Sequence, residues 1–420
     1  MRERMLGNSN ERRPLEGLRV IDLSRALAGP YATLLLAGLG AEVIKVEDPR
    51  GGDLARDNSP YVGRDGVSVT KRYEDDVSIS HLTRSRGKRG VSLNLKQPQA
   101  RKVFHDLVAT ADIVVENFTP GTADRLGVGY EAARAANPAI IYCSLSGFGQ
   151  QENDRIKAMD VIIQALSGAM YTTGEPGDPP VRLGIPFADL LAPVFGVIGI
   201  LAALEMRHRT GEGQHIDVSM LGALTSFVGI ENWQAMRLAG LPGRSGPTVH
   251  RLSPFGAFKC SDGYVAIVAT HDGLTEGLFR AMSDQDLASD PRFITRDMRV
   301  ANAEALEARI EEWSSSRPVA EVVAALSAEG VPVAPVRHPE EALDDPMVVA
   351  RGETEIVTHP AYGTDTELRT NGIPIKFSGA ASGFDPYLPV QIGEHNDAVY
   401  GALLGYSEEE IAALRSAGVI

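Results

Sequence analysis

The chain has 420 residues and a formal net charge of −14, from 41 Lys and Arg against 55 Asp and Glu. This acidity argues against a protein that binds by neutralising nucleic-acid phosphates or by general attraction to an anionic membrane surface. With 43% hydrophobic and 23% charged residues the composition is that of a globular protein, and the length predicts two to three domains. The two cysteines, Cys143 and Cys260, are too few for a disulfide framework and predict a reducing, cytoplasmic location.

No targeting or membrane segment is predicted. The polar, arginine-rich stretch before Gly17 lacks the apolar core of a signal peptide. The longest uncharged apolar run, residues 190–204, contains Pro193, Gly196 and Gly199 and is shorter than the about 20 residues that a membrane span needs. This run therefore predicts a buried helix.

The first half of the chain alternates short apolar strands with helices. Strands are expected at residues 18–22, 42–46, 91–95, 112–116 and 140–145, and helices from Gly29-Pro30 onward and at roughly residues 98–109 and 130–136. Such βαβ alternation predicts an α/β fold with a parallel, doubly wound, Rossmann-like sheet. Residues 53–83 are polar and lack periodicity, and we expect a loop there.

The pattern changes after about residue 210. A strand at residues 215–218 precedes a long helix expected over residues 219–239, and residues 240–252 are rich in Gly, Pro and charge, as a linker is. Residues 255–258 and 264–268 predict a hairpin around Ser261-Asp262-Gly263. Helices at roughly residues 273–282, 300–314 and 318–328 complete a smaller α+β segment, and residues 394–404 and 407–416 predict C-terminal helices.

Three common cofactor or catalytic motifs are missing from the sequence. The turn after the first strand, Ser24-Arg25-Ala26-Leu27-Ala28-Gly29-Pro30, lacks the G-x-G-x-x-G fingerprint of dinucleotide binding. The histidines show no HxxxH spacing, there is no paired-cysteine motif and no G-x-S-x-G elbow. We therefore predict neither NAD nor a metal nor a serine nucleophile.

A basic island interrupts the acidic chain. It contains seven basic residues and no acidic one: Arg84, Arg86, Lys88, Arg89, Lys96, Arg101 and Lys102. Either this is a solvated strand edge and helix face, as most charge runs are, or it is a clamp for a phosphate-rich small ligand. Both interpretations remain open on composition alone.

Asn117 and Phe118 directly follow a predicted strand, at the edge where open parallel sheets bind ligands. Their amide and ring suit hydrogen bonding to a base and stacking on it, although Pro120 and Gly121 also fit an ordinary strand-to-helix turn. The two interpretations are compatible.

Asp189 stands in an otherwise apolar stretch before an apolar helix. One interpretation makes it the N-cap of that helix. The other places Pro193 at the first helical position, which makes Ala192 the cap and frees Asp189. A free carboxylate near a helix N-terminus suits a nucleophile that attacks an activated acyl group.

Five segments in sequence order resemble the class III CoA-transferases, the group of formyl-CoA transferase and carnitine CoA-transferase, which is related to α-methylacyl-CoA racemase. They are RVIDLSRALAGPYATLLLAGLGAEVIKVEDPRGGD, RGKRGVSLNLK, IVVENFTPGTADRLG, DVIIQALSG and RTGEGQHIDVSM. The resemblance implies an interlocked homodimer in which both chain ends build the large domain. It implies a first part of the large domain at residues 14–225, a linker at 226–252, a small α+β domain at 253–330, and a return linker and C-terminal part at 331–420.

The resemblance also implies the site residues. CoA would be bound at Leu93, Lys96, Asn117, Phe118 and Arg125, with Lys88 and Arg89 nearby, and Asp189 would be the nucleophile. Coenzyme A and its thioesters are then substrates, and no tightly bound cofactor is expected. Asp189 would attack the thioester to give a mixed anhydride, the released CoA thiolate would form an aspartyl-CoA thioester, and the acceptor carboxylate would reverse these steps. Backbone N–H groups nearby are expected to stabilise the oxyanions.

The sequence departs from the family pattern in three places. Ala188 replaces the glycine before the aspartate, and Asp48 replaces a basic residue for which Arg50 is a possible substitute. SGPTVHRLSPFG at residues 245–256 stands where formyl-CoA transferases have a glycine-rich loop. This last departure argues against formyl and oxalyl chemistry and for another acyl pair.

Met159 separates two possible activities. The related racemases have a histidine before the aspartate that corresponds to Asp160, and methionine cannot act as a base. We therefore predict CoA transfer, with an acyl-CoA racemase or isomerase and a non-catalytic CoA-binding protein as alternatives. A succinyl-CoA-type donor is suggested only by its frequency in the family. Arg244, His250 and Arg251 could recognise a second carboxylate, or could simply lie on the surface.

Overall fold

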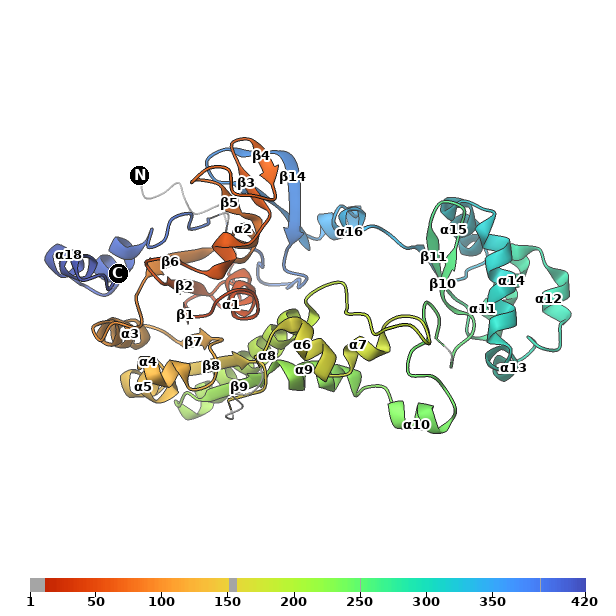
Figure 1. Cartoon of the computed structure of the whole chain (residues 1–420), viewed down its shortest axis with the longest axis horizontal. Helices are drawn as coiled ribbons and strands as arrows, with labels where there is room; N and C mark the ends of the chain where they lie inside the picture. Colours follow the sequence, from red (N-terminus) through yellow and green to blue (C-terminus); the bar gives the residue numbers. More distant parts are fainter. Residues whose placement is uncertain (1–11, 151–156, 250, 386) are drawn as a thin grey trace. The chain divides into compact units, whose positions relative to one another are not determined.

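The computed structural model describes residues 12–150, 157–249, 251–385 and 387–420, which fold into two units with separate cores (Figure 1). The first unit holds the described residues of Met1–Ile163, Ile185–Leu224 and Leu343–Ile420, and the second holds those of Gln164–Gly184 and Thr225–Ala342. The start of the stretch for which no targeting segment was predicted, residues 1–11, lies outside the described residues.

A six-stranded parallel sheet forms the centre of the first unit, which confirms the predicted α/β class. Its strands are β1 (Arg19–Asp22), β2 (Glu42–Glu47), β6 (Lys88–Ser92), β7 (Ile113–Glu116), β8 (Ile141–Ser146) and β9 (His215–Ser219). Their order is β6-β2-β1-β7-β8-β9, with parallel pairing throughout. The chain winds outward in opposite directions from β1 and β7. The gap beyond their carboxyl ends is thus the topological switch point, where ligands bind in such sheets.

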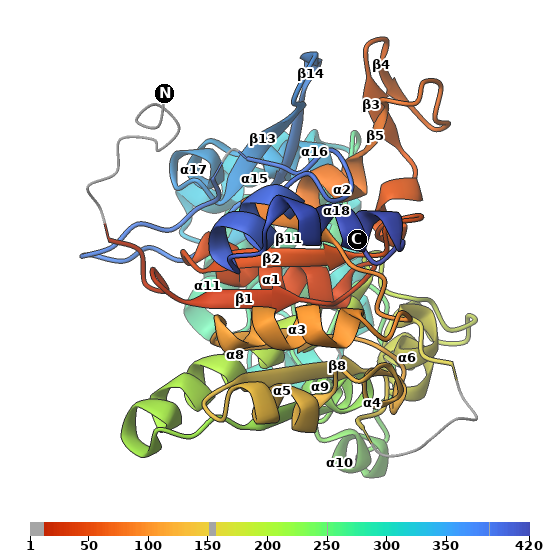
Figure 2. The ribbon, with the colours of Figure 1, turned by 90° about the vertical axis from the view of Figure 1, so that its left-hand side faces the viewer.

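Successive side chains of the strands enter two different cores, as the pleat requires. Ile21, Ile44 and Val114 belong to the core on one face, and Val20, Val43 and Val115 to the core on the other. The first face is covered by α3 (Ala100–Ala109), α5 (Tyr130–Ala136), the π-helix η2 (Asp397–Leu403) and α18 (Glu408–Ser416), the second by α1 (Ala28–Gly38) and α8 (Phe187–Thr210) (Figure 2). The C-terminal segment therefore packs on the same sheet as the N-terminal strands.

Helix α8 contains the apolar run that predicted a buried helix. Its length and composition would also suit a membrane span, as those of many core helices do, but half of its most apolar window is buried. Gly196 and Gly199 permit close packing, because an added Cβ would lie 3.1 Å from Leu145 Cδ2 and 2.9 Å from Ile216 Cγ2 respectively. The two glycines therefore allow α8 to approach β8 and β9 closely.

Three sequence predictions of local structure are wrong. The strand expected at residues 91–95 is β6, which runs from Lys88 to Ser92. Leu93 N still donates to Glu47 O of β2 at 2.7 Å, but Asn94 N turns away and donates to Val419 O at 2.7 Å. The helix expected over residues 219–239 is two helices, α9 (Met220–Val228) and α10 (Trp233–Leu238), and the second is capped by Asn232. The loop expected at residues 53–83 folds into η1 (Leu54–Asp57), β3 (Tyr61–Gly63), β4 (Gly66–Ser68), β5 (Val77–Ser78) and α2 (Ile79–Arg84). Its strands are too short to show alternation.

The second unit is built on an antiparallel sheet of β10 (Phe255–Lys259), β11 (Tyr264–Val268) and β12 (Val333–Pro335). The predicted hairpin is confirmed: Lys259 pairs with Tyr264, and Cys260 N donates to Gly263 O at 2.8 Å. The helices of its core are α11 (Asp272–Met282), α14 (Ala303–Ser315) and α15 (Val319–Ala328), joined by α12 (Gln285–Ser289) and α13 (Arg296–Ala301).

The remaining elements are short. They are α4 (Thr122–Leu126), α6 (Asp160–Leu166), α7 (Ala169–Thr172), α16 (Pro339–Leu343), α17 (Pro346–Ala350), β13 (Thr354–His359) and β14 (Gly363–Asn371). Of these, α4 and the first residues of α6 matter for function, because they lie at the carboxyl-end edge of the parallel sheet.

Candidate active site

The turn between β1 and α1 is held in a strained backbone conformation. Ala26 has a φ of 64°, in the left-handed region that costs a non-glycine residue about 1–2 kcal/mol. Two contacts fix it there: Ala26 N donates to Asp53 Oδ1 at 2.8 Å, and Arg84 Nη1 donates to Ala26 O at 2.9 Å. Asp53 belongs to the segment for which the sequence predicts a loop, residues 53–83, and Arg84 directly follows it.

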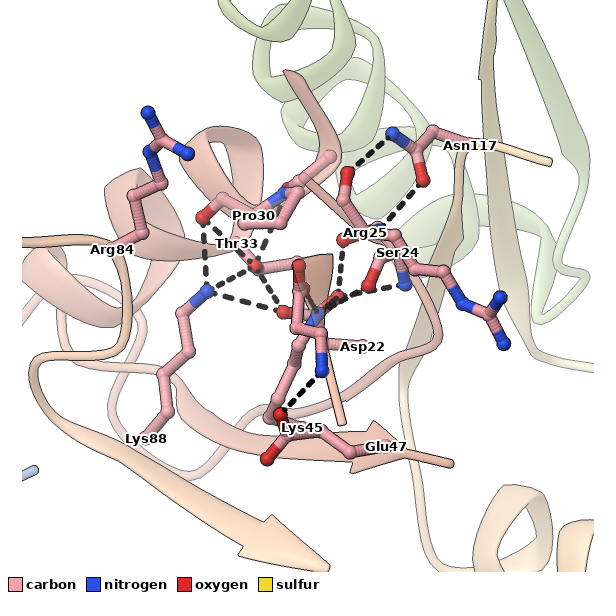
Figure 3. A network of polar contacts seen from close by, with 12 residues as sticks. Asp22, Ser24, Arg25, Pro30, Thr33, Lys45, Glu47, Arg84, Lys88 and Asn117 are labelled. Atoms are coloured by element: carbon pink, nitrogen blue, oxygen red, sulfur yellow. Dashed lines mark hydrogen bonds and ion pairs between the residues drawn. The ribbon is translucent and has the colours of Figure 1, made fainter. Parts of the chain in front are cut away.

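Asn117 bridges the switch point from β7 to this turn. Its Oδ1 accepts from Arg25 N at 2.8 Å, and its Nδ2 donates to Arg25 O at 2.8 Å (Figure 3). A Cβ on Gly29 would lie 2.1 Å from Ser24 Cβ and 3.2 Å from Asn117 Cγ. The single glycine of the turn is thus required for close packing, and the Asn117 amide is committed to the backbone of Arg25.

Phe118, the next residue, is half-buried at the same edge. The Arg25 guanidinium carbon lies 5.5 Å from the centroid of its ring, a cation–π distance. Phe118 N donates to Glu116 Oε2 at 2.6 Å, and burial raises the pKa of Glu116 to about 7. The sequence prediction missed Arg25, because one arginine in a turn carries no signal by itself.

A buried charge network lies beneath the turn (Figure 3). Lys45 Nζ lies 2.8 Å from Asp53 Oδ2 and 3.7 Å from Asp22 Oδ1. Lys88 Nζ contacts Asp22 Oδ2 at 3.1 Å, Pro30 O at 2.9 Å and Thr33 Oγ1 at 2.7 Å. Burial lowers the pKa of Lys88 to about 8, while the two lysines together with hydroxyl donors lower the pKa of Asp22 despite its burial.

Lys88 therefore does not fit the predicted contact with CoA. Its ammonium is fully buried, and its three N–H donors are matched by three acceptors within the protein. Leu93 is also buried, with its side chain in the core beside α3. Neither side chain is available to a ligand in this structure.

Four of the seven basic residues of the island pair with acidic residues. Lys88 pairs with Asp22 at 3.1 Å, Arg86 with Glu355 at 3.2 Å, Arg89 with Glu42 at 3.2 Å and Lys102 with Asp106, one helical turn away, at 2.6 Å. Lys96 and Arg101 remain exposed. The island thus consists largely of individual ion pairs rather than one phosphate clamp, and three of its four acidic partners are too distant in sequence to be recognised locally.

A cavity of about 640 Å³ opens at the switch point. Its walls come from the β1–α1 turn, the segment after β7, the end of β8, the start of α6 and the first turn of α8. It is lined by residues 26–28, 117–120, 145–149 and 157–160 and by Arg125, Asp189 and Met220. Asn117, Phe118, Arg125 and Asp189 thus meet in one cavity. Lys157, which the sequence prediction did not include, lines it as well.

Asp189 lies in the first turn of α8, which begins at Phe187. The expectation that Pro193 opens the helix and that Ala192 caps it is therefore wrong. Proline has no N–H to donate four residues back, so the carbonyl of Asp189 lacks its usual intrahelical partner. The backbone at Asp189 is thus less constrained than that of a regular helix residue.

Asp160, rather than Asp189, caps α8. Its Oδ1 accepts from Ala188 N at 2.9 Å and from Asp189 N at 3.4 Å. These first-turn amides are thereby occupied, and the expected oxyanion donors must come from elsewhere. The pKa of Asp189 is raised to about 6, mainly by burial and further by the negative charge of Asp160, while Arg84 opposes the rise.

Arg125, Arg50 and Met159, which the sequence also singled out, each have their own surroundings in the structure. Arg125 is exposed on α4, where its Nη2 donates to Thr122 Oγ1 at 2.7 Å. Arg50 is paired with Asp48 at 2.7 Å and so is not a free substitute for the missing basic residue. Met159, at the position of the racemase histidine, is 66% exposed in the cavity.

The three candidates for a second carboxylate belong to the second unit. Arg244 Nη1 donates to Asp178 O at 2.6 Å and to Pro179 O at 3.0 Å, and Arg251 pairs with Glu231 at 2.7 Å. His250 lies outside the described residues. Arg244 and Arg251 thus have partners within the protein.

Comparisons with known proteins show the family to which the chain belongs. The family model for CoA-transferase family III matches residues 15–396. The succinyl-CoA:mesaconate CoA-transferase of Haloarcula marismortui is 39% identical over 369 residues, covering 87% of this chain and 90% of that protein. The acetyl-CoA:oxalate CoA-transferase of Acetobacter aceti is 40% identical over 342 residues, covering 80% and 84%. A solved CAIB/BAIF family protein from Brucella suis superposes with a TM-score of 0.80 at 34% identity, covering 94% of this chain and 100% of that one. The resemblance of the five sequence segments is thus confirmed, and the chain belongs to CoA-transferase family III.

Proposed function

We propose that Asp189 is the nucleophile through which this CoA-transferase moves CoA from an acyl thioester to a free carboxylic acid. Its carboxylate oxygen attacks the thioester carbonyl, the carbon–sulfur bond breaks, and a mixed anhydride forms with release of the CoA thiolate. The thiolate then attacks the aspartyl carbonyl and expels the donor carboxylate, which leaves an aspartyl-CoA thioester. The acceptor carboxylate reverses both steps, so the exchange needs no ATP.

The observation that carries this proposal is the place of Asp189 in the switch-point cavity with Asn117, Phe118 and Arg125. Partial burial beside Asp160 raises the pKa of Asp189 to about 6. At neutral pH the carboxylate is then mostly ionised yet poorly stabilised, which favours nucleophilic attack. The cavity holds the reacting groups together and restricts water, which is most of what such an exchange requires.

For CoA we propose binding along the cavity wall formed after β7. Phe118, with Arg25 over its ring, offers a stacking surface for the adenine base. Arg125 and Lys157, which line the cavity, and Lys96 and Arg89, which are exposed, are the basic side chains proposed for the phosphates. Asn117 acts by fixing Arg25. Lys88 and the side chain of Leu93 are left out of this proposal because both are buried.

For the donor we propose a succinyl-CoA-type thioester. The relative from Haloarcula marismortui acts on succinyl-CoA and mesaconate by name, and a 36% identical relative from Agrobacterium fabrum is a succinate–glutarate CoA-transferase. These names describe those proteins, and their agreement on four- and five-carbon dicarboxylates motivates the choice for this chain.

Mass spectrometry of the intact enzyme tests the nucleophile. Incubation with succinyl-CoA should add the mass of CoA less one water to the wild type, and borohydride or hydroxylamine should trap the modification at Asp189. Asp189→Ala should lose both the adduct and multiple-turnover transfer, whereas Asp397→Ala, at an exposed ion pair of the C-terminal segment, should retain them. Full activity of Asp189→Ala would overturn the proposal.

We also propose that the chain forms a homodimer, interlocked as the family resemblance implies. Helix α8 exposes an apolar stripe at Val194, Ile198 and Leu201, at 41%, 56% and 39% of their surfaces. Such contiguous apolar surface on a globular protein marks an interaction site. Ile198→Glu should shift sedimentation equilibrium toward the monomer, and Arg134→Gln, at an exposed ion pair on α5, should not. A monomeric wild type at micromolar concentration would refute the dimer.

A further inference from the structure

Arg84 ends α2 and is attached to the cavity wall by one hydrogen bond. Its Nη1 donates to Ala26 O at 2.9 Å, and Ala26 lines the cavity together with Asp189. Within the described part of the chain, Arg84 makes no other hydrogen bond and no ion pair. Figure 3 accordingly draws no interaction between Arg84 and the nearby network of Asp22 and Lys88.

Other poorly exposed cations of the first unit have a carboxylate partner. Arg56 lies 2.8 Å from Glu47, Arg86 lies 3.2 Å from Glu355, and Lys45 lies 2.8 Å from Asp53. Arg84 is half-buried and differs from them, because among the described residues its guanidinium has one backbone acceptor and no carboxylate partner. Partial burial of a cation without a matched anion is unfavourable, so an anion bound there would be stabilised.

Asp189 and Arg84 are close enough to affect each other electrostatically. The negative charge of Asp189 opposes the fall in the pKa of Arg84 that burial causes, and Arg84 in turn opposes the rise in the pKa of Asp189. Asp53 also faces Arg84, and Asp160 also faces Asp189. Arg84 itself is not among the residues that line the cavity, but its hydrogen bond to Ala26 O places its guanidinium directly behind the Ala26 wall of the cavity that also holds Asp189.

We infer that Arg84 recognises the far carboxylate of a dicarboxylic acyl group, and thereby makes the site selective for dicarboxylic acids. Arginine suits this task because its planar donors match both oxygens of a carboxylate. The same contact would serve donor and acceptor, since both occupy the acyl end of the cavity in turn. This inference rests on the proposed role of Asp189 and identifies the substrate class of that site.

The test compares two donors that differ only at the far end of the acyl chain. Succinyl-CoA carries a carboxylate where butyryl-CoA carries a methyl group. The rate of CoA adduct formation on the enzyme is measured by intact mass in a single turnover, which needs no acceptor acid. Wild type should prefer succinyl-CoA by about 10- to 100-fold, the value of a charge-assisted contact.

Three variants separate recognition from other roles of Arg84. Arg84→Gln should reduce the succinyl preference, which is the ratio of the succinyl rate to the butyryl rate, to less than about threefold. Any loss that comes from the Ala26 turn or from the ionisation of Asp189 affects both donors and cancels in this ratio. Arg84→Lys, which keeps the charge, should retain part of the preference. Arg134→Gln, at an exposed ion pair on α5, is the matched control and should behave as wild type.

The possible outcomes are distinct. Equal loss of the succinyl and butyryl rates in Arg84→Gln would show that Arg84 only shapes the Ala26 turn. An equal shift of the pH profiles for both donors would show that Arg84 only changes the pKa of Asp189. Either result overturns the inference. Equal wild-type rates with the two donors would also overturn it. If neither donor modifies wild-type Asp189, the proposed function itself fails, which is a different result.

Discussion

Replacing Asp160 by Asn is expected to move the acid limb of CoA transfer to lower pH. The pKa of Asp189 is about 6, raised first by burial and second by the charge of Asp160. Asparagine keeps an oxygen that can accept from Ala188 N and Asp189 N, now at 2.9 Å and 3.4 Å from Asp160 Oδ1. The substitution thus removes the charge and preserves the cap of α8.

The size of the shift is set by the repulsion between the two carboxylates. A like charge disfavours ionisation when it lies within about 4–6 Å, and at the upper end of that range two unit charges repel by about 1.4 kcal/mol if the effective dielectric constant of the partly open cavity is about 40. That energy corresponds to about one pKa unit, so the acid limb should fall to roughly pH 5 in Asp160→Asn. Arg84 is unchanged and continues to favour the ionised form of Asp189.

The assay is kcat/KM for succinyl-CoA between about pH 4.5 and 8, since this ratio reports groups of the free enzyme and substrate. Ionisations of the substrate are common to both enzymes and cancel in the comparison. Asp397→Asn is the control, at an exposed carboxylate paired with Arg415. An acid limb that stays in place or rises in Asp160→Asn would refute the assignment of Asp189 as the titrating group beside Asp160.

Three further predictions concern stability. Burial holds the pKa of Asp189 above its ordinary 3.8, so ionisation of this carboxyl group costs folding free energy above pH 6. Asp189→Asn should therefore raise the free energy of unfolding by about 1 kcal/mol near pH 7.5, after allowance for partial exposure. In urea unfolding this gain should vanish below about pH 4. Ala26→Gly should stabilise the protein by up to about 1 kcal/mol, because glycine adopts a positive φ without strain. Ala28→Gly, at the start of α1, should destabilise it by about 0.5–1 kcal/mol. A loss of stability in both variants would contradict the strain at Ala26. Lys45→Met removes the ammonium that pairs with the buried carboxylates of Asp22 and Asp53, and should lower the free energy of unfolding by about 3–5 kcal/mol. Lys88→Met should lower it less. Because the pKa of Lys88 is lowered from 10.5 to about 8, wild type should gain stability over Lys88→Met as pH rises between these values, and a gain on acidification would be the wrong sign.

Periodicity predicted the parallel sheet because its strands are buried on both faces and so appear as continuous apolar runs. Val20 and Ile21, for example, enter different cores although they are neighbours in the chain. Residues 53–83 gave no such signal, since β3, β4 and β5 have at most three residues each. Yet Asp53 from this segment, and Arg84 directly after it, both form hydrogen bonds with Ala26 in the turn of the site.

The surroundings of the charged residues were predicted least well from the sequence alone. Lys88 and Arg89 are neighbours in the chain, but one is buried against Asp22 and the other pairs with Glu42 at the surface. Successive residues of a strand point to opposite faces, so a run of like charges along β6 cannot present one surface. The sequence singled out Asp189 as a candidate nucleophile because its apolar surroundings are local in sequence. Asp160, which caps the helix of Asp189, comes from another helix and was not predicted in that role.

The β1–α1 turn explains how a sheet with the strand order of dinucleotide-binding folds serves a different chemistry. In those folds a glycine-rich turn lets the first helix present free N–H groups to a pyrophosphate. Here Pro30 removes one of these N–H groups, Asn117 occupies the backbone of Arg25, and the space beside Gly29 is filled by Ser24. An anion would therefore meet fewer free N–H groups at this turn, while the first turn of α8 brings a carboxylate to the same switch point. The proposed reactive group of the site is thus a side chain. Its pKa is raised by burial and by Asp160 and lowered by Arg84, and these two residues lie on segments far apart in the sequence.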